Sequence, residues 1–176
     1  MRKIRLFIAM SLDGYIADRG GGVDWLHGHG NDGETPDVYS EFVKTIDTVL
    51  MGWNTYHQIV TELSPTEWVY KDFTTYVITH HEQSSPDAIH FVNANPIDLL
   101  KKLKEANGKD IWICGGANLI QQLVNEDLID DYSITVIPVL LGCGIRLFEN
   151  GKREIKLRLL NTQSYNGMTD LIYTRR

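Results

Sequence analysis

The chain has 176 residues, of which 43% are hydrophobic and 23% charged, as in an ordinary globular protein. We expect one domain over residues 1–176, because this length suits a single hydrophobic core. The net charge of −6 without a basic stripe argues against a nucleic-acid binder. We expect a cytoplasmic protein without a membrane span, because no apolar run approaches roughly 18 residues and no secretory signal is present. The two cysteines form neither a disulfide framework nor a metal-binding pair, so we expect no metal.

The first 125 residues alternate short apolar runs with helical patterns. The apolar runs predict strands at residues 4–10, 48–51, 75–79, 88–92 and 111–114. Between them the sequence predicts helices at residues 36–46, 54–62, 96–106 and 117–125, two of which begin at a proline. Such alternation is typical of a mostly parallel sheet with helices on its faces.

After residue 125 the pattern changes to strands with little helix between them. The predicted strands are residues 132–140, 156–163 and 168–174, and Asn166-Gly167 predicts a hairpin between the last two. We therefore expect an α/β fold with a mixed, mostly parallel central sheet and an antiparallel C-terminal hairpin. Pro138 indicates an edge or a bulge in the first of these strands. An apolar edge at residues 136–141 would be covered by a second subunit.

Two glycines follow the predicted strand at residues 111–114 and precede a helix. Gly115 and Gly116 let a ligand reach the backbone, and the helix after them directs free N–H groups toward a phosphate. A second strand–glycine–helix corner contains Gly52, followed by the amide of Asn54 and the hydroxyl of Thr55. Two such corners at the carboxyl edge of one sheet could hold the two ends of a dinucleotide. Ordinary helix caps are the alternative at both corners.

Several segments together resemble the dihydrofolate reductase-like superfamily, and they follow its order over nearly the whole chain. They are residues 11–17 (SLDGYIA), 47–52 (DTVLMG), 113–117 (ICGGA), 128–132 (LIDDY), 137–144 (IPVLLGCG) and 147–148 (LF). Within the superfamily, the chain is most similar to stand-alone bacterial proteins related to the reductase domain of the riboflavin-biosynthesis deaminase-reductase. The resemblance implies a three-layer α/β/α fold with an NADPH cleft across the sheet, and hence an NAD(P)H-dependent reductase. It also implies a homodimer.

The resemblance also implies which residues bind the cofactor. They are Gly115, Gly116, Ala117 and Asn118 for the pyrophosphate, Gly52, Asn54 and Thr55 for the adenosine side, Ala9 and Ile16 for the nicotinamide, and Thr79 and His80 near the adenine ribose. The family usually places an arginine after the glycine at position 52, where it meets the 2′-phosphate of NADPH. Trp53 stands there instead and cannot form a charged bidentate contact. We expect NADPH as the cofactor, with NADH left open.

Two substrates follow from the resemblance. In folate reductases an acid on the first helix grips the pterin ring, and Asp37 falls near that place, with Glu34 close by. Thr135 matches the hydroxyl that partners the acid, which makes Asp37 and Thr135 the candidate catalytic residues. Favourable charge at the start of a helix is the alternative for the acids. The substrate contacts implied by the resemblance are Trp25 and Leu26, in the loop over the nicotinamide, and Phe42, in the pocket wall.

In the riboflavin branch the substrate is a phosphoribosylaminopyrimidine, which requires cationic groups for its phosphate. That branch usually has a lysine where this chain has Tyr15, and an aspartate–proline stretch that is missing here. We expect a reductase similar to 5-amino-6-(5-phosphoribosylamino)uracil reductase and linked to riboflavin biosynthesis. The alternatives are a dihydrofolate or pterin reductase, a non-catalytic protein that binds a nucleotide or pterin, and an unrelated doubly wound binding protein.

Overall fold

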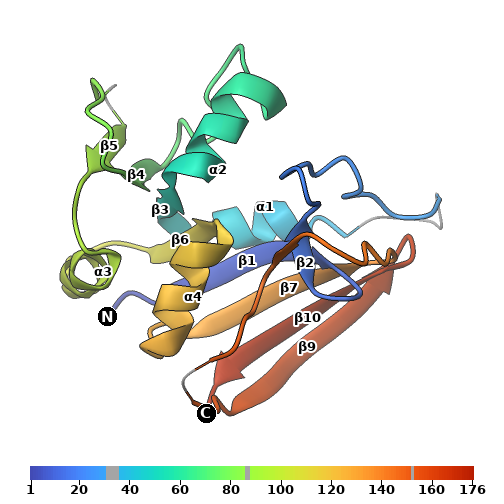
Figure 1. The fold of residues 1–176 in the computed structure, drawn as a ribbon. Helices are drawn as coiled ribbons and strands as arrows, with labels where there is room; N and C mark the ends of the chain where they lie inside the picture. Colours follow the sequence, from blue (N-terminus) through green and yellow to red (C-terminus); the bar gives the residue numbers. More distant parts are fainter. Residues whose placement is uncertain (31–35, 86–87, 152) are drawn as a thin grey trace.

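The protein is described by a computed structural model of residues 1–30, 36–85, 88–151 and 153–176. An eight-stranded sheet with strand order β5-β4-β3-β6-β1-β7-β10-β9 forms its centre (Figure 1). The strands are β1 Ile4–Ser11, β3 Ile46–Gly52, β4 Thr74–Ile78, β5 Ile89–Val92, β6 Asp110–Gly115, β7 Asp131–Ile137, β9 Leu157–Tyr165 and β10 Met168–Arg175. The first six of these pair in parallel, whereas β10 is antiparallel to both β7 and β9. This arrangement confirms the mostly parallel sheet with an antiparallel hairpin.

Helices cover both faces of the sheet and complete three layers (Figure 1). The helices are α1 Val38–Val43, α2 Trp53–Gln58, α3 Pro96–Glu105 and α4 Ala117–Asn125. Leu100 of α3 and Ile120 of α4 pack against one face with Leu6 of β1, while Phe42 of α1 packs against the other face with Trp112. None of the helices in the described ranges is long and apolar enough to cross a membrane.

Two helices differ from their predicted extent, and two short strands were not predicted. The predicted helix at residues 36–46 is confined to α1, because the chain already enters the sheet at Ile46, which is 2% exposed and pairs with Asp110. The helix predicted at residues 54–62 changes after α2 into a π-helix, η1, over Ile59–Leu63. β2 (Tyr15–Ala17) and β8 (Ile145–Arg146) form a separate small sheet that the sequence pattern did not indicate.

The edge expected at residues 136–141 was wrong. β7 lies inside the sheet between β1 and β10, and it ends at Ile137 because Pro138 has no N–H to donate to a neighbouring strand. The edge strand on that side of the sheet is β9.

A loop after β2 is fixed against the hairpin between β9 and β10. Asn166 and Gly167 have φ values of +51° and +75°, as a two-residue hairpin turn of the predicted kind requires. The Asn166 carbonyl accepts the His29 N–H at 3.1 Å, and its side-chain oxygen accepts the Gly30 N–H at 2.8 Å. A Cβ at Gly28 would lie 2.2 Å from that carbonyl, so only glycine fits there. The hairpin turn therefore anchors the loop that follows β2.

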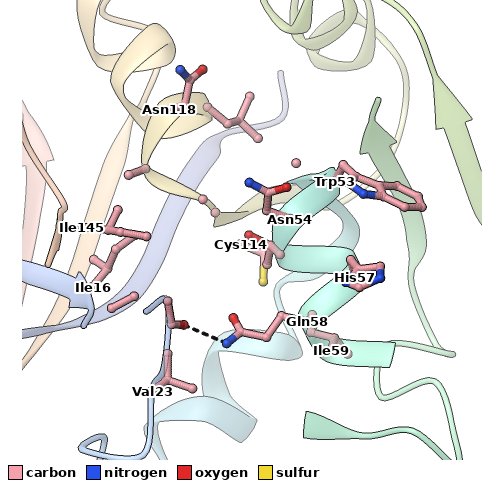
Figure 2. A pocket seen from close by; sticks show the side chains of 18 of the residues that line it. Ile16, Val23, Trp53, Asn54, His57, Gln58, Ile59, Cys114, Asn118 and Ile145 are labelled. Carbon is pink, nitrogen blue, oxygen red and sulfur yellow. Dashed lines mark hydrogen bonds between the residues drawn. The ribbon is translucent and has the colours of Figure 1, made fainter. Parts of the chain in front are cut away.

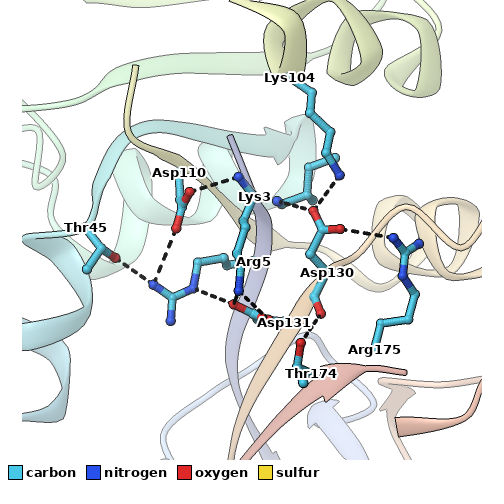
Figure 3. A network of polar contacts seen from close by, with 10 residues as sticks. Lys3, Arg5, Thr45, Lys104, Asp110, Asp130, Asp131, Thr174 and Arg175 are labelled. Atoms are coloured by element: carbon cyan, nitrogen blue, oxygen red, sulfur yellow. Dashed lines mark hydrogen bonds and ion pairs between the residues drawn. The ribbon is translucent and has the colours of Figure 1, made fainter. Parts of the chain in front are cut away.

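A charged network joins the amino ends of β1, β6 and β7 (Figure 3). Asp131 is 4% exposed, and its carboxylate lies 3.0 Å from the Lys3 Nζ and 3.6 Å from the Arg5 Nε. Next to it, Asp130 pairs with Lys104 at 2.6 Å and Arg175 at 3.2 Å. The network ties the strands together at the edge opposite their carboxyl ends.

Candidate functional site

The two strand–glycine–helix corners lie side by side at the carboxyl edge of the sheet. β3 and β6 are neighbours, and Met51, just before Gly52, pairs with Gly115. Gly115 has a φ of +127°, and its peptide bond to Gly116 is cis. A Cβ on Gly116 would lie 3.3 Å from the hydroxyl oxygen of Thr55, so the second corner directly faces the first. The corners therefore share one open space in front of the backbone.

A cavity of about 1230 Å³ occupies this space. Figure 2 shows it between α2 and the small sheet, with Ile16 and Ile145 on one side, Asn118 at one end and Val23 at the other. Ten of the residues predicted to bind cofactor or substrate line it: Ala9, Ile16, Leu26, Gly52, Asn54, Thr55, Gly115, Gly116, Ala117 and Asn118. The fold thus brings together residues from five separate segments of the chain.

Three predicted residues lie beside this cavity without lining it. Thr79 is 5% exposed, and its hydroxyl accepts the His81 N–H at 2.9 Å. His81 is a lining residue, while His80 is not. The indole N–H of Trp25 donates to the Gly22 carbonyl at 3.2 Å, and its neighbour Leu26 reaches the cavity instead.

Asp37 and Phe42 lie at a second, smaller cavity of about 380 Å³ on the α1 side of the sheet. Asp37 caps α1 by accepting the Ser40 N–H at 3.1 Å, and hydrogen bonding from Ser40 holds the pKa of its carboxyl below the ordinary value. A lowered pKa favours helix capping over proton donation at neutral pH. Phe42 stacks on Phe7, with 4.4 Å between the ring centroids. Glu34 lies outside the described residues.

The hydroxyl of Thr135 has a carboxylate partner, which is Asp170 of β10. Asp170 is 3% exposed and accepts hydrogen bonds from Thr135 at 2.6 Å, Gln163 at 2.9 Å and Tyr165 at 3.3 Å. Burial, followed by the negative charge of Asp170, raises the pKa of Tyr165 to about 12. Sequence reasoning missed Asp170, and its one signal is that it is the single charged residue of the strand predicted at residues 168–174.

Aromatic rings surround Trp53 at one margin of the large cavity. Its ring centroid lies 4.5 Å from that of His81 and 5.8 Å from that of His57, and all three residues line the cavity. Trp53, with the imidazoles of His57 and His81 beside it, therefore occupies the position where the family resemblance implied an arginine.

Cys114 contributes a thiol to the cavity wall just before the glycine corner. Its sulfur lies 3.6 Å from the hydroxyl oxygen of Tyr70, another lining residue that the sequence did not single out. Burial raises the pKa of the Cys114 thiol to about 11, and burial also raises the pKa of Tyr70. Both groups are therefore neutral at physiological pH.

We expect Cys114 to resist alkylation until the pH approaches 11. The thiolate is the reactive form, and a raised pKa leaves roughly 100-fold less of it at pH 8 than in a free cysteine. Peptide mass spectrometry after iodoacetamide treatment between pH 7 and 11 measures this. A Cys143→Ser variant isolates the Cys114 signal, and Cys114→Ser supplies the blank. Alkylation of Cys114 at pH 8 as fast as in a free peptide contradicts the burial argument.

The family model of the RibD C-terminal domain matches residues 2–171. The chain belongs to this family. Its relatives include two proteins of Bacillus subtilis (strain 168). YwjB is 42% identical over 99% of this chain and 98% of YwjB, and YyaP is 32% identical over 98% of this chain and 94% of YyaP.

Solved structures also resemble this RibD C-terminal domain. A putative riboflavin biosynthesis protein from Shewanella sp. PV-4 has a TM-score of 0.85 at 29% identity, over 99% of each chain. The deaminase/5-amino-6-(5-phosphoribosylamino)uracil reductase of Thermotoga maritima has a TM-score of 0.70 at 15% identity, over 99% of this chain and 57% of its own. Schistosoma mansoni dihydrofolate reductase has a TM-score of 0.64 at 17% identity, over 99% of each chain. These likenesses confirm the dihydrofolate reductase-like fold.

Proposed function

We propose that this RibD C-terminal domain is an NADPH-dependent reductase that acts on a pyrimidine ribotide. The observation that carries the proposal is the pair of glycine corners facing one large cavity at the carboxyl edge of the sheet. Family membership supports the reaction class, and the Shewanella relative is described as a putative riboflavin biosynthesis protein.

The residues at the corners fit a dinucleotide. The N-cap residues of α2 and α4 are Gly52 and Gly116, and neither helix start has a side-chain cap, so their first N–H groups are free to bind an anion. Side chains on Gly115 and Gly116 would fill the space in front of the backbone and meet Thr55. The pyrophosphate would be held by Gly116, Ala117 and Asn118, and the adenosine side by Asn54 and Thr55.

A bound dihydronicotinamide supplies the hydride for such a reduction. Ala9, Ile16 and Ile145 give the cavity an apolar wall that excludes water from the reacting atoms. Gln58 donates its side-chain N–H to the Gly21 carbonyl at 2.8 Å and so joins the two sides of the cavity, as the dashed line in Figure 2 shows. These residues orient the reactants. For the protonation step we propose Asp37 and Thr135 as groups that orient the substrate by hydrogen bonding, because the lowered pKa keeps Asp37 ionised and unable to donate a proton itself at neutral pH.

The test is NADPH oxidation, followed by absorbance, with 5-amino-6-(5-phosphoribosylamino)uracil and with dihydrofolate in parallel. We expect turnover with the ribotide and little with dihydrofolate, because the cavity beside α1 measures only about 380 Å³ and is walled by the stacked rings of Phe7 and Phe42. Asp37→Ala in the same assay decides whether its carboxylate takes part. Cofactor binding without turnover of either substrate favours the non-catalytic alternative, and failure to bind NADPH or NADH contradicts the proposal.

Trp53→Arg is expected to tighten NADPH binding about tenfold relative to NADH, because a guanidinium can pair with the 2′-phosphate. Energy transfer from the remaining tryptophans to the dihydronicotinamide measures both affinities. NADH serves as the internal reference, since the loss of ring contacts with His81 affects both cofactors. Trp53→Phe keeps an aromatic ring and should leave the NADPH preference unchanged. An unaltered preference in Trp53→Arg would show that position 53 does not face the 2′-phosphate.

A homodimer is also part of the proposal. The edge strand β9 exposes Leu159 and Leu160 to 50% and 52%, at the point where its pairing with β10 shifts register. Sedimentation velocity at micromolar concentration tests the oligomeric state, and a monomer at all concentrations contradicts it.

A further inference from the structure

The loop after β2 presents a positive charge to the large cavity. Among the described residues that line the cavity, Arg19 is the one arginine or lysine. Its side chain is exposed, and no hydrogen bond or ion pair within the described part of the chain engages the guanidinium. A free cation at a cavity wall is suited to a ligand that brings the opposite charge.

The backbone around Arg19 is held in one conformation. The Asp18 carboxylate accepts the N–H groups of Gly20 at 2.7 Å and Gly22 at 2.8 Å, and the Gly22 carbonyl accepts the Asp18 N–H at 3.0 Å. A Cβ on Gly22 would lie 2.7 Å from the Asp18 carboxylate, so any larger residue there would displace that carboxylate. The Asp18 carboxylate is therefore hydrogen-bonded within its own loop and forms no ion pair with Arg19.

The same loop is tied to the opposite wall of the cavity. The Gln58 amide that donates to the Gly21 carbonyl also donates to the Glu62 carboxylate at 3.4 Å. Glu62 lies in η1 and is the one carboxylate among the described lining residues. Arg19 and Glu62 both line the cavity, Arg19 two residues before Gly21 and Glu62 beside Gln58, near the contact that joins the loop to the end of α2 away from Gly52. His57 is the nearest other lining group that can carry charge along this helix.

We propose that Arg19 binds the phosphate of a phosphorylated sugar and that Glu62 accepts hydrogen bonds from the hydroxyls of the same sugar. This inference rests on the proposed function and names the residues that select its substrate. Without Glu62, the arginine alone would bind any anionic ligand, including one that carries a carboxylate in place of a phosphate. The added carboxylate of Glu62 repels a second anionic group and requires donors, which sugar hydroxyls supply.

The test is isothermal titration of the full chain with ribose 5-phosphate, inorganic phosphate and p-aminobenzoylglutamate, each with and without NADPH. Arg19→Gln should weaken the binding of ribose 5-phosphate at least tenfold, and Arg19→Lys should recover part of the lost affinity. Glu62→Gln should weaken the binding of ribose 5-phosphate and leave the affinity for inorganic phosphate unchanged. Arg158→Gln, which removes an exposed arginine on β9, is the matched control and should change nothing.

Equal ribose 5-phosphate binding by the wild type and Arg19→Gln overturns the inference. Tighter binding of p-aminobenzoylglutamate than of ribose 5-phosphate also overturns it, because the site would then select a carboxylate. NADPH binding, measured by energy transfer from tryptophan, should be the same in the wild type and Arg19→Gln. If the wild type does not bind NADPH, the proposed function is contradicted. The titrations of ribose 5-phosphate without NADPH still decide the role of Arg19.

Discussion

Replacing Asp131 with asparagine is expected to lower the free energy of unfolding by about 3 kcal/mol. Asp131 is 4% exposed and is the shared partner of Lys3 and Arg5 at the amino ends of β1 and β7 (Figure 3). The variant leaves the partly buried Arg5 guanidinium with weaker compensation, because Asp110 lies 3.8 Å away. The loss therefore falls at the lower end of the range for breaking a buried ion pair.

Urea unfolding followed by tryptophan fluorescence measures the Asp131→Asn effect. Glu154→Gln is the control, because its ion pair with Lys156 is exposed and spans 3.8 Å, and we expect no measurable change. The network lies away from the cavity, so NADPH affinity of folded Asp131→Asn should equal that of the wild type. A stability loss no larger than in Glu154→Gln would show that the network does not stabilise the strand ends.

Gly115→Ala is expected to weaken NADPH binding at least tenfold and to cost roughly 1–3 kcal/mol of stability. Gly115 has a φ of +127°, which residues with a side chain rarely adopt. Alanine forces the corner to shift, and its methyl group enters the space in front of the backbone near Thr55. The free N–H groups at the start of α4 then move relative to their anion.

Two readouts separate these effects in Gly115→Ala, namely urea unfolding and NADPH titration at a temperature where the variant is folded. Gly151→Ala is the matched control, because Gly151 lies outside the cavity, has no positive φ, and its added Cβ would make only an ordinary contact at 3.6 Å. Wild-type NADPH affinity in folded Gly115→Ala would mean that the cofactor does not use this corner.

The sequence was sufficient for the elements whose causes are local. Apolar runs such as residues 111–114 predicted the buried strands, and Asn166-Gly167 predicted a hairpin turn because both residues tolerate a positive φ. The glycine corners were also visible, since a strand, a glycine and a helix start follow one another along the chain. The family resemblance that these motifs support predicted the dihydrofolate reductase-like fold without any knowledge of tertiary contacts.

Contacts between distant segments were decided only by the tertiary structure. Thr135 meets Asp170 because β7 and β10 are adjacent, and Gln58 meets Gly21 because α2 faces the loop after β2. Neither pairing leaves a local pattern, since each depends on strand order and on how the chain folds back. Arg19 shows the same limit: its sequence neighbours indicate a loop, and only the fold places that loop at the cavity wall opposite Glu62. Local chemistry thus fixed the elements, while long-range packing selected which side chains share a site.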